Sequence, residues 1–126
     1  MPENKGYIRN SDDKGSINIS EDVIAVIAAA AAAEVEGVHG PYISYGMEFA
    51  SIRGRKGLAK CVKLNIDNDD VTLDINIIVD IGFSVNEVGV QVQKAVISAI
   101  EDTVGASVGA VNVNICGIAL KKKPER

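Results

Sequence analysis

The chain contains few of the side chains that carry out catalysis or bind cofactors. Its 126 residues include one histidine, His39, two cysteines, Cys61 and Cys116, and no tryptophan. One histidine and two distant cysteines, with no Cys-x-x-Cys pair, do not complete a typical zinc site. Phosphate-binding loops of the Walker and Rossmann types are also missing from the sequence. We therefore predict no catalytic residues, no metal site and no cofactor, and a protein that is not an enzyme.

Long apolar runs are also missing. The longest, Val23 to Ala33, has eleven residues, fewer than the roughly 18 to 20 that span a bilayer. The first fifteen residues are polar and lack the apolar stretch of a signal peptide. We therefore expect a cytoplasmic protein whose cysteines are reduced.

The acidic balance argues against a generally basic nucleic-acid binder. The formal net charge is −4 and the isoelectric point is about 4.9, whereas a domain that binds nucleic acid through its overall charge is basic. Nine of the 13 basic residues nevertheless gather in two segments. These are Arg53, Arg55, Lys56, Lys60 and Lys63 in the first, and Lys121, Lys122, Lys123 and Arg126 in the second.

Valine, isoleucine and alanine dominate the hydrophobic residues, and the local signals predict alternating strands and helices. Ile17 and Ile19 predict a short strand after a flexible start. Ser20 predicts the N-cap of a helix that runs to about Glu36, with Gly37 just beyond its end. Between residues 40 and 60 the glycines favour loop, with a short strand around residues 49–52.

The second half of the chain carries sharper patterns. Residues 62–66 and 71–81 alternate apolar and polar side chains on either side of a polar turn, which predicts an antiparallel hairpin with one buried and one wetter face. Ser84 and Glu87 form a capping box for a second helix, which Gly105 ends. Residues 111–115 alternate again and predict a last strand.

This order of elements predicts an α+β fold. The economical arrangement is a two-layer sandwich, in which a mainly antiparallel sheet of three to five strands has two main helices packed on one face. We expect a flexible segment at residues 1–15, a single α/β domain at residues 16–120 and a basic flexible tail at residues 121–126.

The first helix offers a candidate interaction surface because residues 23–33 include no polar side chain. A helix that is apolar all round buries more than one face. Its second face, represented by Ala29 and Ala32, either packs against the other helix or forms a self-association surface.

A basic loop offers a second candidate. Gly54 to Gly57 matches the GxxG pattern with which KH domains clamp a nucleic-acid backbone, and basic side chains there would neutralise phosphates. The alternative is a solvated basic loop. The candidate residues are Arg53, Arg55, Lys56 and Lys60.

Two further features have a plain and a functional interpretation. The wetter face of the sheet is either ordinary solvated surface or a docking surface for a partner. The basic tail is either a solubilising segment or a weak, salt-sensitive contact with anionic lipid. The residues expected on the wetter face are Asn18, Asn65, Asp74, Asn76, Asn112 and Asn114.

The ordered set of motifs resembles the alkaline shock protein 23 / general stress protein 24 (envelope stress response) family. Gly15 to Ile24, GSINISEDVI, resembles the opening strand and helix start of that family. Glu34 to Val38, EVEGV, resembles its helix end, and Val111 to Ile118, VNVNICGI, its closing strand. The chain departs from the family pattern at Ile81, where an aromatic residue is common, and at residues 105–107.

Membership would imply a fold and a role rather than a reaction. The family is linked with cell-envelope homeostasis and stress in Gram-positive bacteria, and its members are cytosolic. Some gather at the inner face of the membrane through a separate membrane-anchored partner, and some self-assemble. The resemblance therefore implies a non-enzymatic protein-binding scaffold or adaptor, with homo-oligomer formation among its expected interactions. The alternative from the residues themselves is a small nucleic-acid-binding module that uses Gly54–Gly57.

Overall fold

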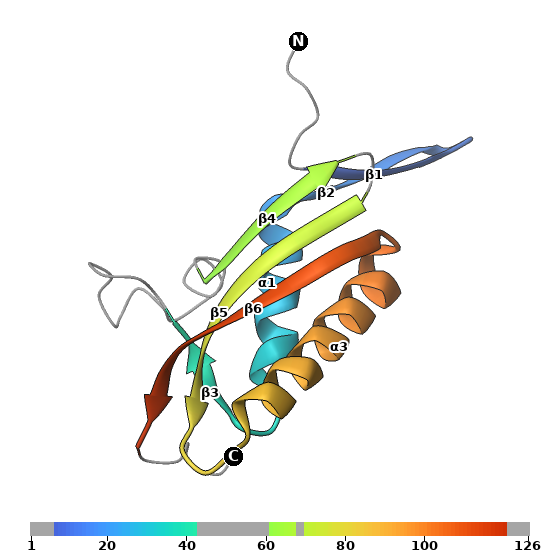
Figure 1. The fold of residues 1–126 in the computed structure, drawn as a ribbon. Helices are drawn as coiled ribbons and strands as arrows, with labels where there is room; N and C mark the ends of the chain where they lie inside the picture. The colour runs from blue at the N-terminus through green and yellow to red at the C-terminus, as the bar shows by residue number, and fades with distance from the viewer. Residues whose placement is uncertain (1–6, 43–60, 68–69, 121–126) are drawn as a thin grey trace.

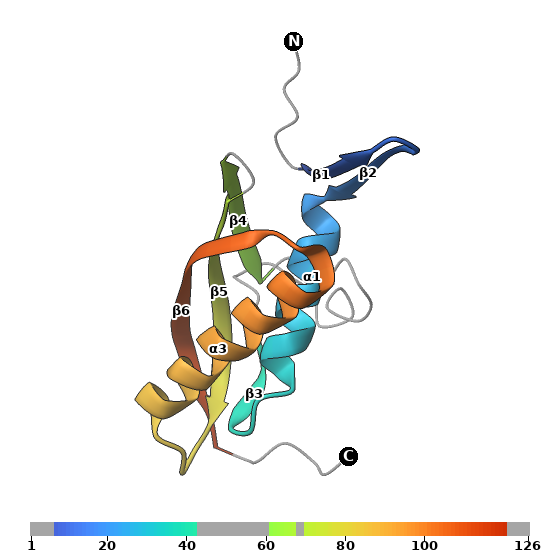
Figure 2. The same ribbon diagram turned by 90° about the vertical axis from the view of Figure 1, so that its right-hand side faces the viewer.

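The computed structural model describes residues 7–42, 61–67 and 70–120, in which two helices and a main sheet form two layers (Figure 1). The elements are, in order, β1 (Tyr7–Asp12), β2 (Gly15–Ser20), α1 (Glu21–Ala33), β3 (Val38–Pro41), β4 (Val62–Asp67), β5 (Asp70–Asp80), α3 (Val85–Val104) and β6 (Ser107–Ala119). Both helices lie on the same side of the main sheet (Figure 2). The predicted α+β class, with two helices packed against a sheet, is confirmed.

The main sheet has four strands with β5 at its centre. β4 pairs antiparallel with residues 70–75 of β5, and β3 pairs antiparallel with residues 77–79. β6 pairs with β5 in parallel over residues 70–80. Because a strand has only two edges, β3 and β4 follow one another along one edge of β5 and β6 occupies the other. The parallel pair is the one departure from an antiparallel sheet, and α3 supplies the crossover that such a pair requires.

Local capping signals locate both helix starts. Ser20 accepts a hydrogen bond on Oγ from the Val23 backbone N–H at 3.4 Å, and Ser84 accepts one from that of Glu87 at 3.3 Å. These contacts satisfy N–H groups that have no partner within the first turn. Gly105 ends α3 with φ of +82°, as predicted for a glycine that adopts the left-handed conformation.

The first helix is shorter than predicted. It ends at Ala33 with Glu34 as its C-cap, not near Glu36. The chain continues through tight turns in which the Val35 N–H donates to the Ala32 carbonyl and the Val38 N–H donates to the Val35 carbonyl. These turns let Val35 pack against the core while the chain reverses into β3. Tertiary packing therefore ends the helix before the glycine signal does.

The N-terminal segment also differs from the prediction. Tyr7–Asp12, within the stretch predicted to be flexible, forms β1 and pairs antiparallel with β2 in a separate two-stranded sheet. The Lys14 N–H donates to the Asp12 side chain at 2.8 Å, and Gly15 has φ of +133°. This is a hairpin turn, although its polar residues are equally typical of a flexible segment.

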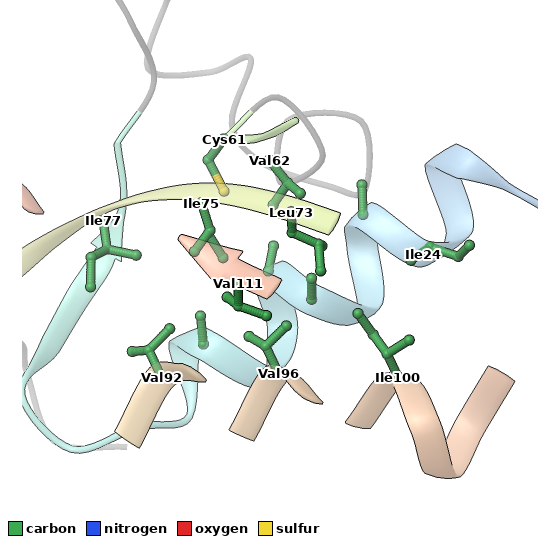
Figure 3. Packing of buried hydrophobic residues seen from close by; sticks show 14 of the residues in the cluster. Ile24, Cys61, Val62, Leu73, Ile75, Ile77, Val92, Val96, Ile100 and Val111 are labelled. Carbon is green, nitrogen blue, oxygen red and sulfur yellow. The ribbon is translucent and has the colours of Figure 1, made fainter. Parts of the chain in front are cut away.

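The hydrophobic core lies between the helices and one face of the sheet (Figure 3). Every second residue of β5 from Val71 to Val79 is at most 1% exposed. α3 contributes a residue at every fourth position, and α1 contributes Ile24 and four alanines. The side chains from α3 and α1 are Val88, Val92, Val96, Ile100, Val104, Ile24, Ala25, Ala28, Ala29 and Ala32.

The core decides between the two interpretations of the apolar helix. Ala29 and Ala32 are 3% and 2% exposed, and α1 packs against both α3 and the sheet. Their small side chains allow α1 to approach its neighbours closely. These two alanines therefore pack within the chain. The prediction that they form an interaction surface is wrong, because neither side chain reaches the surface.

Cys61 precedes β4 and is 1% exposed. Burial raises the pKa of its thiol from 9.0 to about 11, against a smaller lowering by a backbone hydrogen bond. A thiolate in this position would lose its hydration. Cys61 is therefore a core residue, and we expect its protonation to couple to folding.

We expect the free energy of unfolding to fall as the pH rises from about 9 to about 11. In this range the folded thiol keeps its proton, whereas the unfolded thiol loses it, so alkali favours unfolding. Two pKa units correspond to about 2.7 kcal/mol, of which about 2 kcal/mol is lost by pH 10.5. Urea unfolding at pH 8 and pH 10.5 measures the fall. Cys61→Ala should reduce the fall in the free energy of unfolding between these pH values. Cys116→Ala removes an exposed thiol and should leave the fall unchanged. Equal falls in wild type and Cys61→Ala would contradict the assignment.

Candidate functional site: the uncovered face of the sheet

The face of the main sheet opposite the helices is covered by none of the described helices or strands. Strand register places its side chains in rows that cross β4, β5 and β6. One row is Lys63, Asp74 and Asn112, and another is Asn65, Thr72 and Ala110. The β4 and β6 members of both rows are exposed, and the β5 members are half-buried between them. Alternation along each strand thus produces one apolar and one polar face.

Asparagine amides occupy the middle of this face. The Asn114 side-chain amide donates to the Asn76 side-chain oxygen at 2.9 Å, and the two residues are register partners on β6 and β5. Asn112 lies two positions earlier on β6. Amide groups both donate and accept hydrogen bonds, so this region suits a polar partner surface rather than an apolar one.

Carboxylates gather where β4 turns into β5. Asp67 and Asp70 are register partners at the turn, and Asp74 lies further along β5 opposite Lys63. The Ser107 hydroxyl donates to Asp70 at 3.0 Å. A Cβ atom on Gly109 would lie 2.6 Å from Oδ2 of Asp70, so the glycine leaves room for this carboxylate. With three aspartates and one lysine among its described residues, this end of the face is acidic.

Apart from Ala29 and Ala32, which are buried in the core, the predicted site residues divide into three groups. Asn65, Asp74, Asn76, Asn112 and Asn114 lie together on the uncovered face, as predicted for its wetter side. Asn18 does not lie there, because it belongs to β2 in the separate hairpin. Outside the described residues lie Gly54–Gly57, Arg53, Arg55, Lys56, Lys60, the strand expected at residues 49–52 and the basic tail.

One polar pair was missed by the sequence analysis. Nδ1 of His39 lies 2.8 Å from an Asp80 carboxylate oxygen. The Asp80 side chain is 8% exposed and that of His39 is 35% exposed. The partners are 41 positions apart, and no local pattern connects them. The pair links β3 to the end of β5.

Two further properties of the described residues bear on function. Among residues 7–42, 61–67 and 70–120, no three His, Cys, Asp or Glu side chains are placed to hold a metal ion. Within the same ranges, no helix has the length and apolar character needed to cross a bilayer. The described surface offers hydrogen-bonding and charged groups on a broad face, and this arrangement is suited to binding.

Comparison with known families gives the classification. Residues 9–120 match the model of the alkaline shock protein 23 family, which is described as having a cell envelope-related function. The chain belongs to this family. The resemblance inferred from the sequence is thereby confirmed, and the association with the cell envelope holds for the family as a whole.

Relatives of this family member occur in Streptococcus and Bacillus. The uncharacterized protein Spy1535 of Streptococcus pyogenes serotype M6 is 35% identical over 112 residues, which cover 88% of this chain and 84% of the relative. The uncharacterized proteins YqhY and YloU of Bacillus subtilis are 29% and 28% identical, over 88% and 82% of this chain and 82% and 88% of their own lengths.

Solved structures give a more distant match. Variants of the MamM CTD match with a TM-score of 0.49 and 16% identity. The first two cover 77% of this chain and 94% of their own.

Proposed function

We propose that this family member is a non-enzymatic scaffold or adaptor that binds a protein partner and contributes to cell-envelope homeostasis under stress. Its docking surface is the uncovered face of the main sheet. The observation that carries the proposal is the asymmetry of the two layers, in which two helices cover one face and polar side chains from three strands occupy the other.

The chemistry of the face indicates the kind of partner. Its centre carries amides, and its turn end carries Asp67, Asp70 and Asp74 beside one described lysine, Lys63. A partner surface with hydrogen-bonding groups and an excess of Lys or Arg complements this arrangement. The nucleic-acid alternative depends on basic residues outside the described ranges, so protein binding is the function that the described residues support best.

The family description guides the proposal for location. The protein acts in the cytoplasm and reaches the inner face of the membrane through a membrane-anchored protein partner, without inserting into the bilayer itself. Assembly with further copies of the chain is part of the same role.

Asn65→Arg should weaken capture of the partner at least tenfold. Asn65 is exposed on β4, and an arginine there adds bulk and positive charge facing a basic partner. Such a like-charge contact opposes binding. The measurement is quantitative mass spectrometry of proteins that co-purify with the tagged chain from native cells at low salt.

The matched control is Asn86→Arg, the same substitution at an exposed position of α3 on the helical side. It should capture the partner as wild type does. Undiminished capture by Asn65→Arg, or equal loss in both variants, would exclude the uncovered face as the docking surface. Both variants should unfold at the wild-type temperature, which checks that the fold is retained.

A further inference from the structure

β6 forms an edge of the main sheet and carries no charged residue. It pairs with β5 on one side over residues 70–80, and no described strand pairs with its other side. Its thirteen residues, SVGAVNVNICGIA, include no Lys, Arg, Asp, Glu or Pro. Proteins commonly protect long edge strands with charges or prolines because unpaired backbone groups attract another strand. This edge therefore has the composition of a strand that pairs with another chain.

Hydrogen bonds show which residues of β5 direct their backbone N–H and C=O groups toward β6. The Asn76 N–H donates to the Cys61 carbonyl at 3.0 Å, and the Asn76 carbonyl accepts from the Tyr42 N–H at 2.9 Å. Both partners lie on the β3 and β4 side. Because successive residues direct their backbone groups to opposite edges of a strand, Ile75 and Ile77 direct theirs toward β6.

The same alternation identifies the outward residues of β6. Ile75 is the register partner of Val113, so in a parallel ladder it bonds to the residues on either side, Asn112 and Asn114. Val113 therefore points its N–H and C=O away from β5, as do Val111 and Ile115. The Gln93 side chain donates to the Val111 carbonyl at 3.0 Å, as expected for an outward carbonyl that a side chain of α3 can reach.

We propose that this edge pairs antiparallel with the same edge of a second copy, about a two-fold axis at Val113. The register shifts of β6 leave residues 110–115 as a regular segment. Within it, Val-Asn-Val-Asn-Ile alternates in the same way in both directions. The axis places Val113 opposite its own copy and Asn112 opposite Asn114 of the second chain.

Charge and exposure argue for a second copy as the occupant. Two uncharged strands meet without like-charge repulsion, and the facing asparagine amides supply donors and acceptors to one another. On the helical side, Val113 and Ile115 are half-buried. Pairing would cover this apolar row, and the Val111 carbonyl would exchange Gln93 for a backbone N–H of the second copy.

The pairing adds to the proposed function. Asn112 and Asn114 belong to both surfaces, but the residues changed in the two tests, Asn65 for docking and Val113 for pairing, differ. It joins two sheets edge to edge and leaves the uncovered faces continuous across both copies, which would present two docking surfaces side by side. A failure of Asn65→Arg to affect partner capture and a failure of the chain to dimerise are separate results.

Val113→Pro tests the pairing. Proline lacks the N–H that pairing requires, but the Val113 N–H points outward, so the β5–β6 ladder loses no bond. In sedimentation equilibrium at micromolar concentrations, the wild type should have a molecular mass of twice 13.3 kDa. The variant should have a mass of 13.3 kDa and an unchanged circular dichroism spectrum. Asn114→Pro removes an inward N–H and should instead destabilise the fold. A wild type that stays monomeric to about 1 mM, or a folded Val113→Pro variant that still dimerises, would overturn the proposal.

Cysteine cross-linking gives a test that does not require the proline variant to fold. In a Cys116→Ser background, Val113→Cys should form an intermolecular disulfide on mild oxidation, because the axis brings this position opposite itself. Ile115→Cys is the control, since the same axis separates its two copies by four residues, or about 13 Å, beyond the reach of a disulfide. Equal cross-linking of both variants, or of neither, would contradict a two-fold axis at Val113.

Discussion

Ala32→Glu should strongly destabilise the protein at neutral pH. The Ala32 side chain is 2% exposed in the core shared by α1, α3 and the sheet. A glutamate there must either bury a carboxylate without a partner or hold a proton well above its usual pKa, and it must also displace its close-packed neighbours. Together these effects cost about 4 kcal/mol or more, a large part of the 5 to 15 kcal/mol that stabilises a typical domain. Circular dichroism and thermal unfolding measure the loss.

Ala30→Glu is the matched control, because Ala30 lies on the same helix and is exposed. Alanine and glutamate are both good helix formers, so this change should alter the free energy of unfolding by less than about 0.5 kcal/mol. A stable Ala32→Glu variant would show that α1 does not pack as described. Since Ala29 and Ala32 are buried, Ala30→Glu is also the variant with which to examine the outer side of α1 for self-association.

Gly37→Ala should destabilise the protein by about 2 to 4 kcal/mol. Gly37 has φ of +98°, a conformation that residues with a side chain rarely adopt. A Cβ atom at this position would also lie 2.8 Å from Val88 Cγ2 and 2.9 Å from Phe83 Cδ2. The backbone strain and the overlap add, because relieving the overlap would push α3 away from the turn that follows α1. Urea unfolding measures the change.

Gly82→Ala separates the two contributions. Gly82 has nearly the same backbone angle, φ of +100°, but a Cβ atom there would meet nothing within 4 Å. Its substitution should therefore show the conformational cost alone, about 1 kcal/mol. If both variants lose the same stability, close packing at Gly37 is not what requires the glycine.

Gly37 also affects the position of the candidate site. The turn at Gly37 leads into β3, and the Gly37 carbonyl accepts a hydrogen bond from the Asp80 N–H at 2.8 Å. Asp80 in turn contacts His39. The glycine thus places the strand that borders the far end of β5, and through it that end of the uncovered face.

Several elements could be predicted because their causes are local. Ser20 and Ser84 begin helices since a side-chain oxygen next to free backbone N–H groups stabilises the first turn wherever the helix packs. The alternation in residues 62–66, 71–81 and 111–115 predicts strands with one apolar face, since successive side chains point to opposite sides. The same alternation correctly placed five of the six polar residues expected on the wetter face.

Other features depend on contacts between distant segments. The hairpin of β1 and β2 was not predicted because its turn residues also occur in disordered chains. Only the pairing of the two strands distinguishes a hairpin from a disordered segment. The all-apolar composition of residues 23–33 does not show which side of the helix meets α3, so Ala32 and Ala30 look alike in the sequence. Residues 39 and 80 come together only because β3 pairs with β5.

By itself, then, the sequence determined the helix starts, the alternating strands, the scarcity of catalytic groups and the family, because each follows from neighbouring residues or their order. The tertiary structure alone decided that Ala29 and Ala32 are buried, that no described element covers one face of the sheet, and that β6 is an edge among the described strands with outward backbone groups at Val113. The physical reason is that a residue's periodicity sets which way it points relative to its neighbours, whereas strand order and helix docking set what it meets.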